Sequence, residues 1–233
     1  MPRFKTSIAL ISGGLDSAVA AAIAKTESNQ VVALSFNYNQ RHKVELEAAM
    51  KIAERYAVKH VIVPLSLDFI SNSALTSKDI AVPENRALDD MLSSIPVTYV
   101  PSRNIIFLSI ATALADVENA DAIYMGINAV DYSGYPDCRP EFVTSFQRMI
   151  DKSTRRGVAG ASIAIKAPLV MLSKADIIKK GAELNVPFEL THSCYNPSDE
   201  GLACGLCDSC LIRRKGFQQA GVADPTRYAN LQQ

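Results

Sequence analysis

The segment Ser12-Gly13-Gly14-Leu15-Asp16-Ser17 stands between a short apolar run, Ser7–Ile11, and an alanine-rich run, Ser17–Lys25. This order predicts a strand, a glycine turn and a helix. Glycines let the turn approach a ligand closely, and the free N–H groups of a helix start favour a phosphate. A Mg²⁺ ion that bridges phosphates would suit Asp16. A tight turn with a Ser or Asp N-cap is the alternative, but the position directly after a strand favours phosphate binding.

Strand-like and helical segments alternate along the rest of the chain. Val44, Ala48, Ile52 and Tyr56 recur every four residues in a charged background, as in an amphipathic helix. Residues 67–100 interrupt the pattern, and we expect an irregular excursion there with a short helix near 87–93. The other expected strands are 31–36, 60–65, 122–127 and 163–165, and the other expected helices are 141–153, 174–184 and a buried one at 104–117, which is apolar nearly all round.

This alternation predicts an α/β fold with a parallel twisted sheet and helices on both faces. Ligands of such sheets bind beyond the carboxyl ends of the strands. We therefore expect the functional residues in the loops Ser12–Ser17, Asn37–His42 and Asn128–Arg139.

The composition excludes several classes of protein. The 233 residues carry 24 Lys+Arg and 24 Asp+Glu, so the formal net charge is zero, which disfavours a nucleic-acid-coating protein. No run reaches the ~18 apolar residues of a membrane helix. Arg3, Lys5 and the apolar run after them imitate a secretion signal, but Gly13, Gly14 and Asp16 break its apolar core. We expect a cytoplasmic protein with no membrane or nucleic-acid partner.

The cysteines gather near the end of the sequence. Cys194, Cys204, Cys207 and Cys210 can complete a closed tetrahedral zinc shell, which would be structural. An iron–sulfur cluster is the alternative, because clusters use the same Cys-x-x-Cys-x-x-Cys spacing. Disulfides are disfavoured in the cytoplasm. We expect a main domain over residues 1–190 and a zinc-binding tail over 191–233 that packs on it. The fifth cysteine, Cys138, stands apart in another loop.

The glycine loop resembles that of the ATP pyrophosphatase superfamily, also called the PP-loop enzymes, whose fold is Rossmann-like. No Gly-Lys-Ser/Thr follows it, as a Walker loop requires, and Gly-x-Gly-x-x-Gly is absent. The resemblance implies that the loop grips the pyrophosphate of ATP while a substrate oxygen attacks the α-phosphorus. The implied ATP-binding residues are Leu10, Ile11, Ser12, Gly13, Gly14, Leu15, Asp16, Ser17, Ala18, Val19, Ala20 and Arg41.

Other segments make the resemblance more specific. The chain is similar to the 7-cyano-7-deazaguanine synthase family of queuosine biosynthesis over nearly its whole length. The most distinctive match is the loop Asp131–Pro140, and the others are 37–42, 100–104, 193–195, 204–210 and 224–226. Two residues depart from the family pattern. Asn39 stands where the family usually has Gly, and His192 where it usually has Trp. Because four cysteines already complete a metal shell, we expect His192 to pack or to face the substrate.

The family resemblance implies an ATP-dependent carbon–nitrogen ligase. Its substrates would be 7-carboxy-7-deazaguanine and ammonium, joined through an adenylated carboxylate and an amide to give a nitrile. Asp16 with Mg²⁺, Ser17 and Lys174 are the expected catalytic residues, although Lys174 reads equally well as a solvated surface charge and Lys166 could act in its place. Tyr132, Asp137 and Arg139 are the expected substrate-binding residues. Cys138 is expected to pack or to line the substrate site, because the chemistry needs no covalent adduct.

Two other functions remain open from the sequence. One is a PP-loop tRNA-thiolating enzyme with an iron–sulfur cluster, which usually has a basic surface or an RNA-binding domain. The other is a nucleotide-binding regulator whose tail forms a dimer contact. The sequence leaves the oligomeric state open, a homodimer included.

Overall fold

The computed structural model describes residues 2–38, 44–67, 69–70, 72–77, 79–87, 90–91, 95–130 and 134–229. Five parallel strands form one sheet in the order β3-β2-β1-β4-β5. The strands are β1 Phe4–Leu10, β2 Ser28–Asn37, β3 Lys59–Pro64, β4 Ala122–Tyr124 and β5 Ala164–Lys166. The predicted parallel sheet and the predicted positions of its strands are therefore confirmed, with boundaries shifted by up to three residues.

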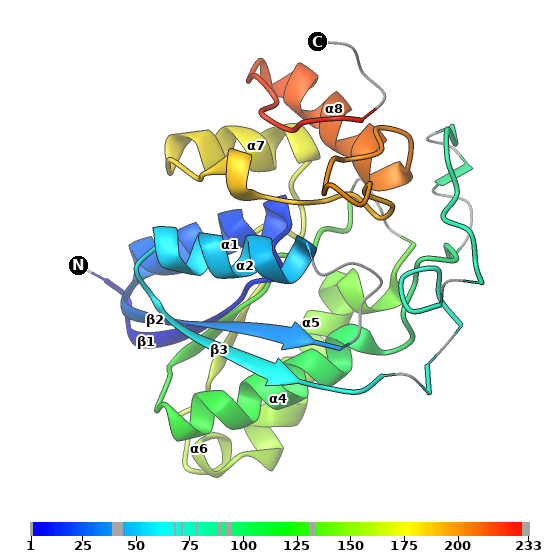
Figure 1. Cartoon of the computed structure of the whole chain (residues 1–233). Coiled ribbons are helices and arrows are strands. Elements are labelled where there is room, and N and C mark those ends of the chain that lie inside the picture. The colour runs from blue at the N-terminus through cyan, green and yellow to red at the C-terminus, as the bar shows by residue number, and fades with distance from the viewer. Residues whose placement is uncertain are drawn as a thin grey trace.

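Helices cover both faces of the sheet. The α-helices are α1 Leu15–Glu27, α2 Val44–Arg55, α4 Arg103–Val117, α5 Pro140–Ser153, α6 Arg155–Val158, α7 Lys174–Glu183 and α8 Asp208–Ala220. Two short 3-10 helices are η1 Pro136–Cys138 and η2 Phe188–Leu190. Figure 1 shows α1, α2, α7 and α8 on one side of the strands and α4, α5 and α6 on the other. The short helix expected near 87–93 lies partly outside the described residues.

The central strand β1 separates two apolar cores. Successive residues of a strand point to opposite faces. Ile8 packs into the core under α4 and α5, whereas Ala9 packs into the core under α1 and α2, and both are fully buried. The small side chains of α1 let that helix lie close to the sheet, and Ala18, Val19 and Ala20 are buried there. A sheet buried on both faces explains why its strands read as apolar runs.

Helix α4 departs from the prediction of a buried helix, because one of its sides is exposed. Leu108, Ala111 and Ala115 are fully buried against the sheet, but Ile105 is 42% exposed and Val117 is 76% exposed. The helix covers an outer face of the sheet, so only one of its sides has a protein layer to pack against. Its uniformly apolar sequence hid that asymmetry.

The tail beyond residue 190 lies against the helices of the first face. Phe217 of α8 is buried in the same core as α1 and α7 and contacts Phe188 edge-on, with ring centroids 5.2 Å apart. The four cysteines of the tail form a separate small core with Ala74 and Val82 of the excursion. The division of the chain at residue 190 stays a prediction.

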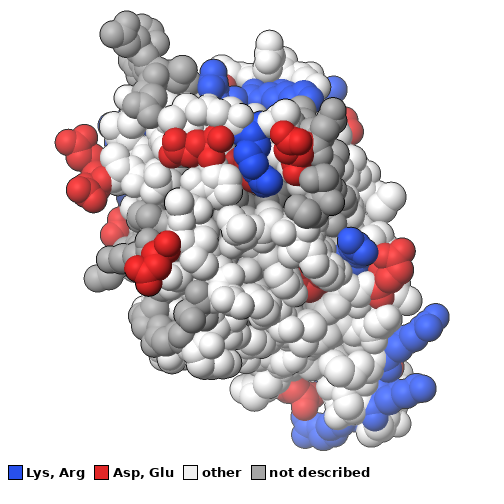
Figure 2. All heavy atoms as spheres, turned by 90° about the vertical axis from the view of Figure 1, so that its right-hand side faces the viewer, with Lys and Arg blue, Asp and Glu red and all other residues white. Residues whose placement is uncertain are grey.

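The face of the molecule seen in Figure 2 carries both signs of charge among uncharged residues. Lys and Arg side chains gather at its lower right edge and along its top, whereas several Asp and Glu side chains lie at its left edge away from the basic ones. In the described part of the chain, no helix has both the length and the apolar character needed to cross a membrane.

Candidate functional site

A cavity of about 290 Å³ opens at the carboxyl ends of β1 and β4. The strand order turns there: the chain leaves β1 on one face of the sheet and reaches β4 from the other. Open parallel sheets bind ligands at such a switch point. Of the predicted ATP-binding residues, those of the loop and the strand before it line the cavity: Leu10, Ile11, Ser12, Gly14, Leu15, Asp16 and Ser17.

The other predicted ATP-binding residues lie elsewhere. Ala18, Val19 and Ala20 continue α1 into the apolar core and do not line the cavity. Gly13 forms the turn itself. Arg41 lies outside the described residues.

The glycine loop is held in one conformation by contacts that exclude side chains. Gly13 has φ +91°, and a Cβ there would lie 2.1 Å from the carbonyl oxygen of Glu45. Gly126, just after β4, lies against the first turn of α1. A Cβ added at Gly126 would be 2.6 Å from the backbone nitrogen of Ser17. The Ser17 hydroxyl donates to the Gly14 carbonyl at 2.8 Å. Helix α1 has no side-chain cap, so the N–H groups of its first turn are left for a ligand.

Asp16 and Lys174 form an ion pair on the cavity wall. The Lys174 Nζ lies 2.7 Å from Oδ1 and 2.6 Å from Oδ2 of Asp16. Ser173 positions the lysine, because its hydroxyl caps α7 by accepting from the Asp176 N–H at 3.2 Å. The Lys174 side chain is 16% exposed, so it is not the solvated surface charge that was the alternative to a functional role. A cation and a carboxylate beside a phosphate-type loop suit a nucleotide and its Mg²⁺.

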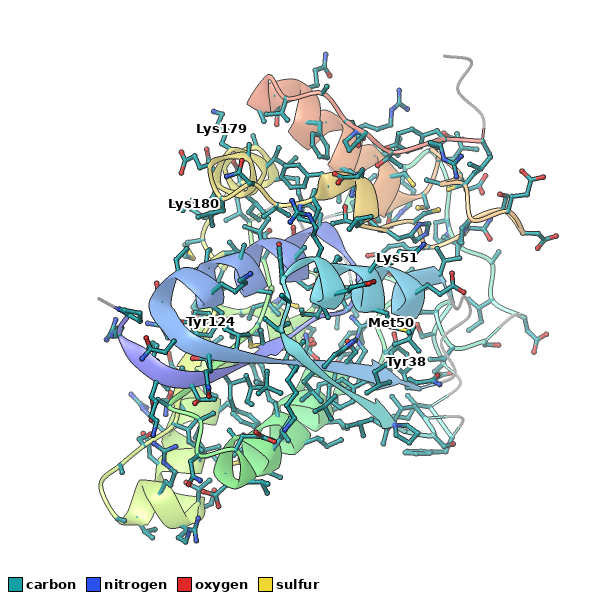
Figure 3. The ribbon with its side chains drawn as sticks, turned by 60° about the vertical axis from the view of Figure 1, so that its left-hand side comes forward. Tyr38, Met50, Lys51, Tyr124, Lys179 and Lys180 are labelled. Atoms are coloured by element: carbon teal, nitrogen blue, oxygen red, sulfur yellow. The ribbon has the colours of Figure 1, made fainter. Side chains whose placement is uncertain are left out.

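A second pair of charged side chains lines the same cavity. Glu45 is in the first turn of α2, and Arg103 is the first residue of α4. Burial raises the pKa of Glu45 to about 7, with Arg103 opposing the shift. Arg103 donates to the hydroxyl of Tyr38 at 3.4 Å, and burial raises the pKa of that phenol. Figure 3 shows Tyr38 at the carboxyl end of β2.

Sequence reasoning missed both charges of this second pair. Arg103 stands inside the segment 100–104 that carries part of the family resemblance, which was the available signal. Glu45 had no such signal, since an acidic residue in the first turn of a helix is ordinary.

The predicted substrate-binding residues of the loop 131–140 do not line the cavity where the structure describes them. The Asp137 carboxylate is buried and accepts from the backbone N–H of Asn104 at 3.0 Å, so it caps the start of α4. Arg139 is exposed at the start of α5. Tyr132 lies outside the described residues. Asp137 therefore supports the cavity wall through α4.

Cys138, like Tyr135, is a described residue of this loop that borders the cavity. Asn104 donates from Nδ2 to its Sγ at 3.4 Å. Burial, with the nearby Asp137 charge, raises the pKa of the thiol to about 12. Because a thiol with so high a pKa carries almost no thiolate at neutral pH, the environment is that of a lining residue rather than a nucleophile.

The four cysteines of the tail converge as a metal site would require. All four are buried, and their sulfur atoms lie within 4.8 Å of one another. Backbone N–H groups donate to the sulfurs, including Cys204 N–H to Cys194 Sγ at 3.2 Å and Cys207 N–H to Cys204 Sγ at 3.3 Å. Such N–H groups stabilise thiolates, so the cluster can hold a metal ion with four ligands.

The tail also forms part of the cavity wall. The His192 N–H donates to the Gly13 carbonyl at 2.8 Å, which ties the tail directly to the glycine loop. His192 lines the cavity, as expected of a residue outside the metal shell. We call this contact between His192 and Gly13 the strap. Arg213 of α8 is buried and holds the strap in place, because it donates to Thr191 Oγ1 at 2.8 Å and pairs with Asp224 at 3.2 Å. The four-cysteine cluster and the glycine loop thus belong to one continuous structure.

Known proteins resemble this chain over most of its length. The family model described as "Queuosine biosynthesis protein QueC" matches residues 6–221. The chain is 55% identical to the 7-cyano-7-deazaguanine synthase of Solidesulfovibrio magneticus over 224 residues, 95% of each chain. It is 56% identical to the protein of the same name from Desulfatibacillum aliphaticivorans over 224 residues, 95% of this chain and 96% of that one. Among solved structures, an NMN synthetase from Francisella tularensis aligns with a TM-score of 0.48 and 19% identity over 95% of this chain and 79% of that one.

Proposed function

The chain belongs to the QueC family of queuosine biosynthesis proteins, and from this we propose that it is the ATP-dependent ligase that makes 7-cyano-7-deazaguanine from 7-carboxy-7-deazaguanine and ammonia. The observation that carries the proposal is the glycine loop Ser12–Ser17 at the switch point of the sheet, in one cavity with Asp16 and Lys174. Relatives at this level of identity favour this function over a tRNA-thiolating enzyme. None of the five cysteines forms a disulfide, which suits the cytoplasm that we propose as its location.

The reaction needs two activations of oxygen. In the first, a carboxylate oxygen of the substrate attacks the α-phosphorus of ATP, and pyrophosphate leaves. Ammonia then displaces AMP and gives the amide. In the second, the amide oxygen attacks another ATP, and AMP leaves with that oxygen as the nitrile forms and a proton is lost. Each round therefore carries one of the two carboxylate oxygens away in AMP.

The residues of the cavity suit these steps. We assign the N–H groups and hydroxyls of the loop Ser12–Ser17 to the phosphates, and Asp16 to Mg²⁺, which would offset the charge of the pyrophosphate. Lys174 is placed to neutralise the charge that develops on the phosphates once the nucleotide has separated it from Asp16. Free ammonium is the proposed source of nitrogen.

We propose zinc as the metal of the four-cysteine site. A Zn–S bond of about 2.3 Å in a tetrahedron puts the thiolates about 3.8 Å apart. Cys204 Sγ and Cys210 Sγ are 4.0 Å apart, close to that spacing. An iron–sulfur cluster would itself occupy the centre and hold its thiolates farther apart. With four protein ligands the ion has no open position, so its role would be to hold the tail in place.

The test is to incubate the protein with Mg²⁺, ATP, ammonium and 7-carboxy-7-deazaguanine and to follow the products by mass spectrometry and nucleotide chromatography. We expect the nitrile, with AMP and pyrophosphate. Absence of any nitrile would refute the function, and ADP as the sole nucleotide product would refute the adenylation route.

A further inference from the structure

Two charged side chains of the cavity lack an ion-pair partner in the described part of the chain. Of the described charged residues that line it, Asp16 is paired with Lys174, and Arg213 with Asp224. Glu45 and Arg103 line the same cavity, yet neither takes part in an ion pair within 4.0 Å among the described residues. The charges of Glu45 and Arg103 act on each other, but no direct ion pair joins the two side chains, so both keep hydrogen-bonding capacity that a ligand can use.

Arg103 has donors to spare. Its guanidinium carries five N–H groups, and the structure gives it one hydrogen bond, to Tyr38 at 3.4 Å. The charges of Arg103 and of Asp16 both act on the thiol of Cys138, so Arg103 and this residue of the glycine loop are both within electrostatic reach of one side chain. Arg103 and the glycine loop line one cavity, so a carboxylate bound by Arg103 would share that cavity with the nucleotide.

The wall around these charges is flat and aromatic. Phe36 and Phe107 stack with ring centroids 4.0 Å apart and planes 7° apart, and Tyr38 lies against Phe107 at 5.5 Å. All three rings line the cavity together with Glu45 and Arg103. Aromatic faces favour a planar heterocycle, and the two opposite charges favour one that has an anion at one end and N–H donors at the other.

We propose that Arg103 binds the carboxylate of 7-carboxy-7-deazaguanine and that Glu45 accepts from the ring N–H and amino group of its guanine-like edge. This inference rests on the proposed function. A planar guanidinium and a carboxylate can form two parallel hydrogen bonds, and a carboxylate accepts two adjacent N–H donors in the same way. Arg103 holds the substrate by the group that reacts, whereas Glu45 holds it by the group that stays unchanged.

The two residues therefore serve different halves of the reaction. The carboxylate charge exists in the first half only, because the amide intermediate is neutral. The guanine-like edge is present in both halves. Loss of Arg103 should impair the conversion of the acid and spare that of the amide, while loss of Glu45 should impair both.

The experiment measures kcat/KM of Arg103→Gln and Glu45→Gln with two substrates, 7-carboxy-7-deazaguanine plus ammonium and 7-amido-7-deazaguanine without ammonium. Arg148→Gln and Glu47→Gln, which remove the same charges at exposed positions of α5 and α2, are the controls. We expect Arg103→Gln to lower kcat/KM about 10- to 100-fold with the acid and less than about threefold with the amide. We expect Glu45→Gln to lower it about 10- to 100-fold with both. Both controls should behave as wild type, and Arg103→Lys should recover part of the activity on the acid.

Two further measurements distinguish substrate binding from nucleotide binding and from loss of structure. Both cavity variants should bind ATP with the wild-type Kd and melt no lower than wild type. An equal loss on acid and amide for Arg103→Gln, or a weaker ATP Kd, would show that Arg103 serves the nucleotide and would overturn the inference. If the wild-type protein makes no nitrile from either substrate, the proposed function itself fails; if it does and the variants match it, only this inference fails.

Discussion

The amino group of Lys174 contacts both carboxylate oxygens of Asp16, at 2.7 and 2.6 Å, across a sequence separation of 158 residues. The first turn of α1 and the first turn of α7 thereby meet at the floor of the cavity. Under the proposed function, this pair would keep the carboxylate compensated until a nucleotide and its Mg²⁺ bind. Both residues would then take new partners, which is why we expect each to matter for turnover.

Removal of either member of this pair should reduce turnover more than stability. We expect Asp16→Ala to abolish turnover and Lys174→Met to lower kcat by about 100-fold or more, since each removes a charge at the transferring phosphates. Lys179→Met is the control, because Lys179 lies on the same helix and is exposed (Figure 3). Steady-state kinetics and thermal melting check this; full activity of Asp16→Ala would contradict the Mg²⁺ role.

Loss of one metal ligand should release the metal and loosen the tail. We expect Cys204→Ser to lower the melting temperature by about 10 °C, because metal binding supplies folding free energy at such a site. Metal analysis of the purified protein should find one zinc per chain in wild type and in Cys138→Ser, and much less in Cys204→Ser. Unchanged zinc and melting in Cys204→Ser would refute the four-cysteine site.

Cys138 should be dispensable for the chemistry. Its thiol is protonated at neutral pH because burial raises its pKa to about 12. We expect Cys138→Ser to keep kcat within about tenfold of wild type, whereas loss of a true nucleophile costs several orders of magnitude. A trapped covalent adduct with substrate, seen by mass spectrometry of the intact protein, would show the opposite.

A single methyl group at Gly126 should damage ATP binding. Its Cβ would lie 2.6 Å from the backbone of Ser17, so the glycine loop must move. We expect Gly126→Ala to weaken ATP binding at least about tenfold by isothermal titration, since the N–H groups of the loop lose their alignment. Zinc content should stay at the wild-type level, which would show that the tail is still folded.

The pH should act on substrate binding and on stability in opposite directions through Glu45. Arg103 and Tyr38 are the titratable groups that the structure places against its carboxyl. Its pKa is about 7 in the folded free protein, against 4.5 for an ordinary glutamate, so the folded state holds the proton more tightly. The part of the unfolding free energy that comes from the protonated Glu45 is fully present below about pH 4.5 and is lost as the pH rises through about 7. The ionised form, however, is the one that accepts two N–H groups, so kcat/KM should rise through the same range.

Glu45→Gln tests both effects. We compare the change that the substitution makes in the free energy of unfolding of the ligand-free protein at two pH values. This change should be more stabilising at pH 8 than at pH 5, by on the order of 1–3 kcal/mol. The substitution should also flatten the rise of kcat/KM near pH 7. Denaturant unfolding at the two pH values and a pH–rate profile provide the measurements. An equal effect of the substitution on stability at both pH values would contradict the raised pKa.

The sequence predicts the local features of this fold well. Strands and helices follow from periodicity, and the glycine loop and the cysteine spacing each lie within a short segment. The sequence alone does not predict contacts between segments that are distant along the chain. Nothing in Lys174 distinguishes it from Lys179 until α7 is placed against α1. Glu45 and Arg103 read as ordinary helix-end charges, and the exposed side of α4 depends on which layers surround it. Asp137, expected to bind substrate, has its carboxylate engaged in capping α4.

The strap from His192 to Gly13 has a consequence for how the protein folds during its synthesis. The glycine loop leaves the ribosome long before the residues that close its cavity, Arg213 among them. A nascent chain therefore exposes its glycine loop before the residues that complete the cavity wall have been made. The wall is completed by the same segment that carries the four cysteines, so folding of the four-cysteine cluster and completion of the cavity are coupled.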